Sequence, residues 1–256
     1  MRQEDEKEGV SAPSFKVDLA GLTVMLGMPS HRDLPPQTNS SILSTWDLMA
    51  RHGVELKTNV VNGSSLVQVA RNRVAHEFLQ SDANRLFWVD SDMSWKAEDF
   101  LRFVAMSSEL EVVGASYPIR KDPIQFCVRG YKDGKIYEGN NFGCITDSEM
   151  GFGLGFTIVQ RKVIEELAAK AKTTILPDMG STIVSDIFRT GSVVTARSVA
   201  LGADGEFMGE DMHFFEDVKK LGYKVWLDPS VDVSHIGQKE YKGSLKETLS
   251  RTTDAA

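Results

Sequence analysis

The alternation of apolar runs with helix-like segments is the feature that most constrains the fold of this chain. Runs of the two kinds follow one another through the first half, at 22–30, 40–50, 54–61, 65–80, 85–90, 97–106 and 111–117. This βαβ alternation is typical of a parallel sheet with helices packed on its faces. We therefore predict an α/β fold with a mixed, mostly parallel sheet flanked by helices.

The two longer helices of this half have recognisable apolar stripes. Asn39 or Ser40 is of the type that caps a helix N-terminus and precedes the first of them. The residues expected to face the core there are Ile42, Trp46, Met49 and Ala50. In 65–80 the corresponding stripe consists of Val67, Ala70, Val74, Ala75 and Phe78.

The second half is less regular. Residues 118–150 carry turn signals typical of short antiparallel strands, and 173–208 is polar with no strong period. The expected strands and helices around these stretches are 155–159, 161–172, 210–222, 223–227 and 231–235. No linker divides the chain, so we expect a single domain at 17–242 with flexible tails at 1–16 and 243–256.

Composition limits the classes of function. A net charge of −7 disfavours a whole surface built to grip nucleic acid, although it leaves room for a local basic groove. No apolar run reaches the roughly 18–20 residues that span a bilayer, and the charged first ten residues lack the apolar core of a secretory signal. Cys127 and Cys144 form neither a disulfide framework nor a zinc site. We expect free thiols in a reducing cytoplasm.

Two acids follow the third apolar run directly, Asp90 and Asp92. In an open parallel sheet, ligands bind outside the carboxyl ends of the strands. Adjacent carboxylates are unfavourable there unless a positive group lies between them, and a divalent cation bridging a diphosphate is one such group. An acidic turn or helix cap is the alternative interpretation.

A second acidic pair and a histidine lie far along the chain. Glu210 and Asp211 open an amphipathic segment, which is followed by Asp228-Pro229 and then by His235. Neutral imidazole is a good ligand for a borderline metal ion. Taken alone, acids at a helix N-terminus stabilise the helix dipole, and a lone histidine is usually structural or solvated.

Together these motifs resemble those of GT-A glycosyltransferases. Asp90-Ser91-Asp92 resembles the Asp-x-Asp of that superfamily, and Glu210-Asp211 with His235-Ile236-Gly237 resembles its acidic pair and closing His segment. The likeness spans roughly residues 20–240 and is to short, stand-alone, family-2-like members, many from bacteriophages. It implies a Rossmann-like GT-A fold, with 17–117 binding a nucleotide sugar and 118–242 an acceptor.

The resemblance also implies roles for these residues. Asp92 and His235 would bind Mn²⁺ or Mg²⁺, and Asp90, next to Ser91, would contact the metal or the donor ribose. Asp211 would be the general base of an inverting displacement, with Glu210 as the alternative. In a retaining enzyme the base assignment fails while the metal assignment survives. A UDP-sugar is the first choice of donor.

Further candidates lie on the donor side of this scheme. Pro29 and Ser30, at the end of the first strand, would lie over the nucleoside, and a simple loop is the alternative. Arg71 could reach a phosphate or remain a surface arginine, and Arg120 would lie near the donor sugar or diphosphate. Gly153, between Gly151 and Gly155, would allow close approach of a sugar or acceptor, with Phe152 or Phe156 stacking on a ring. Ordinary turn glycines are the alternative.

Two other functions are alternatives to sugar transfer. A nucleotidyltransferase would usually carry a Gly-rich, basic signature after the first strand, which 25–36 lacks. A non-catalytic nucleotide-sugar or glycan-binding module has no need of a base such as Asp211. We expect the acceptor to be either a hydroxymethylated pyrimidine in phage DNA or a surface or protein glycan. A phage-encoded enzyme would act in the host cytoplasm. Basic residues that could flank DNA are Lys162, Lys170, Lys172, Arg189 and Arg197.

Overall fold

The structure, a computed structural model, describes residues 17–31, 33–130, 136–176, 179–237 and 239–253. The tail expected at 1–16 lies outside these residues. The tail expected at 243–256 does not appear as such, because α7 (Leu245–Thr253) occupies most of it. Leu245 is 4% exposed and belongs to the core, which explains why this segment is helical. The two cysteines are free thiols, as predicted.

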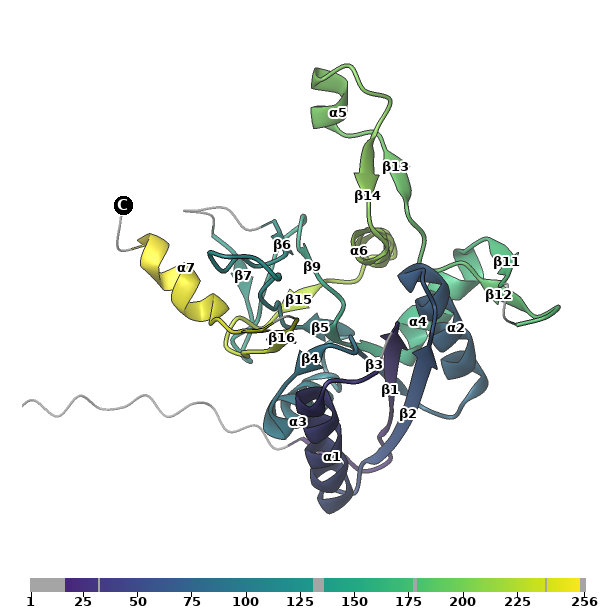
Figure 1. The fold of residues 1–256 in the computed structure, drawn as a ribbon, viewed down its shortest axis with the longest axis vertical. Coiled ribbons are helices and arrows are strands. Elements are labelled where there is room, and N and C mark those ends of the chain that lie inside the picture. Colours follow the sequence, from purple (N-terminus) through teal and green to yellow (C-terminus); the bar gives the residue numbers. More distant parts are fainter. Residues whose placement is uncertain (1–16, 32, 131–135, 177–178, 238, 254–256) are drawn as a thin grey trace, which may run out of the picture.

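A large mixed sheet forms the centre of the molecule (Figure 1). Its strand order is β2-β1-β3-β10-β5-β15-β8-β7, with bounds Glu55–Asn62, Thr23–Ser30, Arg85–Val89, Phe156–Gln160, Val112–Gly114, Trp226–Leu227, Ile145–Thr146 and Glu138–Gly139. β1 pairs in parallel with β2 and β3, and β5 pairs in parallel with β15. β10 lies antiparallel between β3 and β5. The carboxyl ends of β1, β3 and β5 therefore meet at one edge.

Helices cover both faces of this sheet. The alternation within β3 shows why, because Leu86 and Trp88 point into one apolar cluster while Phe87 and Val89 point into the other. One face is covered by α2 (Val67–Gln80), α4 (Arg161–Lys170) and α6 (Glu210–Lys220). The other is covered by α1 (Pro36–Arg51) and α3 (Ala97–Met106). The predicted α/β fold, a mixed sheet flanked by helices, is confirmed.

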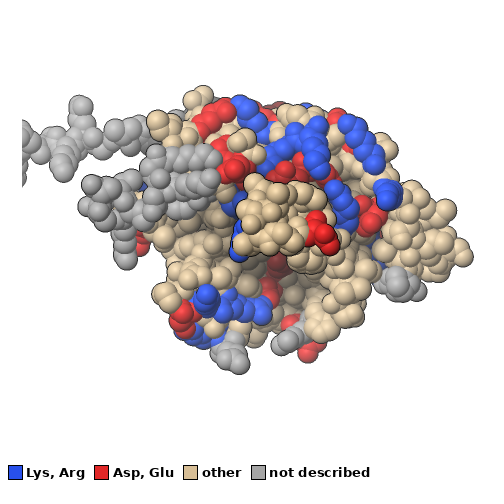
Figure 2. All heavy atoms as spheres, turned by 90° about the horizontal axis from the view of Figure 1, so that it is seen from above, with Lys and Arg blue, Asp and Glu red and all other residues tan. Residues whose placement is uncertain are grey.

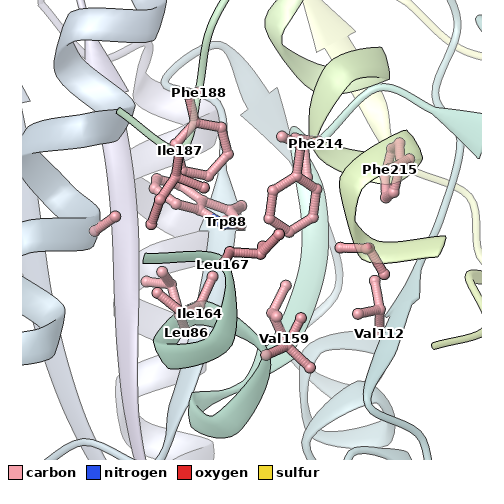
Figure 3. Close-up of a cluster of buried hydrophobic side chains, with 14 of the residues drawn as sticks. Leu86, Trp88, Val112, Val159, Ile164, Leu167, Ile187, Phe188, Phe214 and Phe215 are labelled. Atoms are coloured by element: carbon pink, nitrogen blue, oxygen red, sulfur yellow. The ribbon is translucent and has the colours of Figure 1, made fainter. Parts of the chain in front are cut away.

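An aromatic stack holds the irregular segment before residue 190 against the first of these faces (Figure 3). The Phe188 ring lies edge-on to Trp88 at 5.1 Å and stacks on Phe214 at 5.1 Å. Asn72 adds hydrogen bonds of 2.8 Å and 3.0 Å to the backbone N–H and carbonyl of Phe188. Burying a phenylalanine contributes about 1.5–3 kcal/mol, so these contacts anchor a stretch that has no regular pattern of its own.

The first helix differs from the prediction in both its start and its buried face. It begins at Pro36, so Asn39 and Ser40 lie inside it and neither is the N-cap. Its buried residues are Thr38, Ser41, Thr45 and Met49, whereas Trp46 is 44% exposed. Trp95 satisfies two of these polar side chains: its carbonyl accepts from Ser41 Oγ at 2.9 Å and its Nε1 donates to Thr45 Oγ1 at 2.9 Å.

The polar stretch 173–208 forms two small hairpins. β11 (Thr173–Ile175) pairs with β12 (Ile183–Ser185), and β13 (Gly191–Val193) pairs with β14 (Glu206–Met208). The second hairpin carries α5 (Ala196–Ala200) and projects from the body at the top of Figure 1. We call residues 190–209 the arm. Seen from above in Figure 2, the arm is a mostly uncharged mound beside interspersed basic and acidic side chains.

Smaller pairings complete the fold around the sheet edge. β4 (Met93–Ser94), β16 (Ser234–Ile236) and β17 (Glu240–Tyr241) form a three-stranded sheet, and β6 (Val128–Arg129) pairs with β9 (Gly151–Phe152). Within the described ranges, no helix is both long enough and apolar enough to cross a membrane.

Candidate active site

A pocket of about 450 Å³ opens at the carboxyl ends of β1 and β3. Its walls contain all but one of the site residues suggested by the sequence: Pro29, Ser30, Arg71, Asp90, Ser91, Asp92, Arg120, Glu210, Asp211 and His235. The further lining residues include His31, Ser64, Ser65 and Tyr117, which the sequence did not single out. Side chains more than a hundred positions apart thus converge at the edge where an open sheet binds its ligands.

Backbone pairing places Asp92 beside His235. β4 runs antiparallel to β16 with Met93 opposite His235, and the Ile236 N–H donates to the Asp92 carbonyl at 2.7 Å. The two side chains face each other, with 3.5 Å between His235 Nε2 and Asp92 Oδ1. The predicted neighbourhood of these two residues is therefore set by a strand pairing.

The tautomer of His235 follows from its other contact. Its Nδ1 lies 2.9 Å from the Pro118 carbonyl oxygen, which can only accept, so Nδ1 carries the proton. Burial lowers the pKa of His235, which favours the neutral ring. The Nε2 lone pair then faces a carboxylate oxygen.

This arrangement fits a divalent cation with two protein ligands. Mn²⁺ accepts both imidazole nitrogen and carboxylate oxygen, so it could be shared between these two side chains. Across the described residues there is no group of three or more His, Cys, Asp or Glu side chains that could hold a metal. Ions of the Mg²⁺ type often take one or two protein ligands and complete their shell with phosphates and water. Asp92 and His235 fit that description.

Asp90 is already engaged elsewhere, so the structure does not place it as a third metal ligand. Its Oδ1 accepts from Arg71 Nη2 at 2.8 Å, and its Oδ2 accepts from the Tyr117 hydroxyl at 3.2 Å. The second expectation for Asp90, a contact with the donor ribose, stays a prediction.

Arg71 lies in the floor of the pocket, and the alternative of a surface arginine is wrong. The residue is 2% exposed on α2, and its Nε donates to Glu210 Oε1 at 3.3 Å as well as contacting Asp90 through Nη2. Burial alone would lower the pKa of Arg71, but the charges of Asp90 and Glu210 outweigh burial and raise it. Its Nη1 is buried and has no hydrogen-bond partner among the residues that the structure describes.

Asp211 has the properties expected of a general base. It sits in the first turn of α6, and burial, followed by the charge of Glu210, raises its pKa from 3.8 to about 6. The positive charge of Arg71 lowers the pKa of Asp211, but by less than burial and Glu210 together raise it. A base whose pKa lies near the working pH is well matched to proton removal. Because Glu210 is paired with Arg71, the geometry favours Asp211 over Glu210.

The glycines of 151–155 pack closely against side chains of the site. Gly153 does not line the pocket; a Cβ on it would collide with the Tyr117 hydroxyl. A Cβ on Gly155 would come within 2.5 Å of Asp90 Oδ2 and 2.8 Å of the Tyr117 hydroxyl. These glycines therefore make room for the Tyr117–Asp90 contact. Phe152 and Phe156 are fully buried in the core, so the expectation that either stacks on a sugar is wrong.

Comparison with solved structures finds distant likenesses. No family model and no curated protein matches the chain. It is similar to a solved glycosyltransferase involved in the glycosylation of the major capsid of PBCV-1, at 11% identity and a TM-score of 0.31, over 57% of this chain and 63% of that chain. It is also similar to 4-diphosphocytidyl-2C-methyl-D-erythritol synthase from Anaerococcus prevotii DSM 20548, at 11% identity and a TM-score of 0.33, over 78% and 96%. The chain spans less than two thirds of the first of these, and both likenesses concern the fold alone.

Proposed function

We propose that this protein transfers a sugar from a nucleotide diphosphate to an acceptor hydroxyl with the help of Mn²⁺ or Mg²⁺. UDP-sugars are the first choice of donor. The observation that carries the proposal is the convergence in one pocket of a candidate cation pair, Asp92 and His235, with a tuned acid, Asp211.

The chain's own residues supply the proton chemistry. Asp211 removes the proton from the acceptor hydroxyl while the hydroxyl oxygen forms a bond to the anomeric carbon of the sugar. The bond from that carbon to the diphosphate oxygen breaks, and its electron pair leaves with the diphosphate. Attack from the face opposite the diphosphate inverts the anomeric configuration. Glu210, ion-paired with Arg71, keeps its negative charge beside Asp211 and adds to burial in raising the pKa of Asp211 to about 6.

Other residues of the pocket serve the leaving group. Arg71 contributes positive charge from the floor of the pocket, and Arg120 offers a half-exposed guanidinium to the phosphate oxygens. A divalent cation held by Asp92 and His235 would offset the charge that develops on the diphosphate. Ser30, Ser64 and Ser65 line the side nearest β1, where a nucleoside would lie.

Two kinds of acceptor remain as proposals, a glycan and a modified base in DNA. The basic residues suggested for DNA do not form a uniform field. Arg189 is paired through both terminal nitrogens with Asp217, and Arg197 pairs with Glu206 at 3.0 Å. A glycan on a surface or protein therefore suits this face better than a duplex, whose binding depends on unpaired cations.

A panel of nucleotide sugars, incubated with the protein and Mn²⁺ and followed by mass spectrometry, tests the proposal. We expect metal-dependent release of the nucleoside diphosphate from one or a few donors. Asp92→Ala and His235→Ala should each abolish that turnover while circular dichroism shows the fold intact. Binding of nucleotide sugars with no turnover from any donor would favour a non-catalytic binding module instead.

A further inference from the structure

Arg120 lies on a loop that is tied to the segment carrying His235. The Pro118 carbonyl, two residues before Arg120, accepts the proton of His235 Nδ1. Asp122 forms an ion pair with Lys239 across the two segments. Gly237 leaves room for the arginine, since a Cβ there would lie 3.0 Å from Arg120 Cδ. The guanidinium is thereby held over the mouth of the pocket.

The carboxylate that this guanidinium contacts is the one expected to bind the cation. Arg120 Nη2 forms an ion pair with Asp92 Oδ2, while the other oxygen of the same carboxylate faces His235 Nε2 at 3.5 Å. The side chain of Arg120 is 43% exposed and that of Asp92 is 29% exposed, so the arginine has solvent into which it can move. A guanidinium and a divalent cation on one carboxylate repel each other, so they compete.

We propose that Arg120 is a built-in competitor for the divalent cation at Asp92, and that an incoming diphosphate draws it away so that metal and nucleotide bind as a cooperative pair. This inference rests on the proposed metal site. A diphosphate offers the planar guanidinium a bidentate partner that is better than a single carboxylate oxygen. Once Arg120 has moved to phosphate, both oxygens of Asp92 are open to the cation.

Thermodynamic reciprocity makes this measurable without any turnover. If the diphosphate strengthens metal binding by removing Arg120 from Asp92, the metal must strengthen diphosphate binding by the same factor. Removing Arg120 therefore has two opposite effects. The free protein should bind the cation more tightly, and UDP should strengthen cation binding less than it does in the wild type.

The test measures Mn²⁺ binding to the full chain by electron paramagnetic resonance, with and without UDP. Relative to wild type, Arg120→Ala should bind Mn²⁺ alone about tenfold more tightly, and the strengthening by UDP should fall by about the same factor. Lys121→Ala is the matched control, because it removes the same charge from the next position, which is exposed. It should leave both quantities within about twofold of wild type.

Each other outcome decides something. If Asp92→Ala abolishes Mn²⁺ binding but Arg120→Ala does not tighten it, the competition is refuted and the metal site stands. If Lys121→Ala tightens binding as much as Arg120→Ala, general electrostatics explains the result and the inference falls. If wild type binds no Mn²⁺ with or without UDP, or Asp92→Ala binds it normally, the metal site and the inference fall together. Should Arg120→Ala prove unfolded by circular dichroism, Arg120→Gln carries the same comparison.

Discussion

The two arginines of the pocket differ in burial and in the number of their partners. We call the surroundings of Arg71 the structural side of the site and those of Arg120 the exchangeable side. Arg71 has a side chain 3% exposed and contacts two carboxylates, Asp90 and Glu210. Arg120 is 43% exposed and has one carboxylate partner among the described residues, Asp92. The buried cation fixes the acids around it, whereas the exposed one can trade its partner for a ligand. Substitutions on the two sides should therefore have different signatures.

The largest effect is expected from Arg71→Met. Methionine fills a similar volume but leaves the carboxylates of Asp90 and Glu210, whose side chains are only 24% and 14% exposed, without their cation. Breaking a buried pair from one side costs about 3–5 kcal/mol, so unfolding in urea should show a free energy lower by about that amount. Arg73→Met is the control, because that side chain is 35% exposed in an i,i+4 pair with Glu77. The control should change stability by about 0.5 kcal/mol or less. Equal losses in both variants would mean that the Arg71 network is not structural.

Asp211→Asn should separate stability from activity. Transfer should fall by about a hundredfold or more, because the amide cannot accept the proton, while UDP binding is retained. In the wild type, kcat/KM should rise with pH through about 6, since Asp211 acts only when ionised.

The same raised pKa makes a prediction about stability. Because burial raises the pKa of Asp211 from 3.8 to about 6 in the folded state, its contribution is fully present below about pH 4 and is lost as pH rises through 6. Asp211→Asn should therefore be more stable than wild type at pH 7 by about 1–3 kcal/mol and nearly equal to it at pH 4. Asp204→Asn, an exposed acid on the arm, should show no such gain. Wild-type transfer rates in Asp211→Asn would reassign the base.

The regular half of the fold could be predicted because burial on both faces of the sheet fixes its pattern. The helix at 97–106 has the expected bounds, and the strands expected at 22–30 and 85–90 differ from Thr23–Ser30 and Arg85–Val89 by one residue at an end. The polar face of α1 was not predictable, since Ser41 and Thr45 are buried only because Trp95 lies opposite them. A local period carries no information about such a distant partner.

The candidate site divides in the same way. Acids at strand ends and helix starts can be recognised locally, and the pocket gathers Asp92, Asp211 and His235. The burial of Arg71 depends on Glu210, which is 139 positions away, so no nearby residue could reveal it. The support of Asp90 by Tyr117 and Gly155 likewise needs the pairing of β3 with β10. Local motifs thus point to candidate groups, and tertiary pairing determines which of them are neutralised.

Gly155→Ala tests whether close packing at Gly155 supports the structural side of the site. The added methyl group would lie 2.5 Å from Asp90 Oδ2 and 2.8 Å from the Tyr117 hydroxyl, so the contact between these two side chains must be disturbed. Overpacking of this kind costs about 1–3 kcal/mol, and the melting temperature should fall accordingly. Gly191→Ala, where a Cβ meets nothing within 4 Å, is the matched control and should be close to neutral. If Gly155→Ala leaves the melting temperature unchanged, packing at Gly155 does not support Asp90.

The smallest change in stability is expected on the exchangeable side, from Arg120→Gln. Its ion pair with Asp92 is partly exposed to water, and such pairs contribute about 0–1 kcal/mol, so urea unfolding should barely distinguish the variant from wild type. Loss of binding energy for UDP in the presence of Mn²⁺, measured by calorimetry, should nevertheless be clear, because the guanidinium would no longer reach a phosphate. Urea unfolding and calorimetry of UDP binding together then distinguish Arg120→Gln from Arg71→Met. If Arg120→Gln is destabilised as strongly as Arg71→Met, both arginines are structural, and the pocket has no exchangeable cation with which to meet a diphosphate.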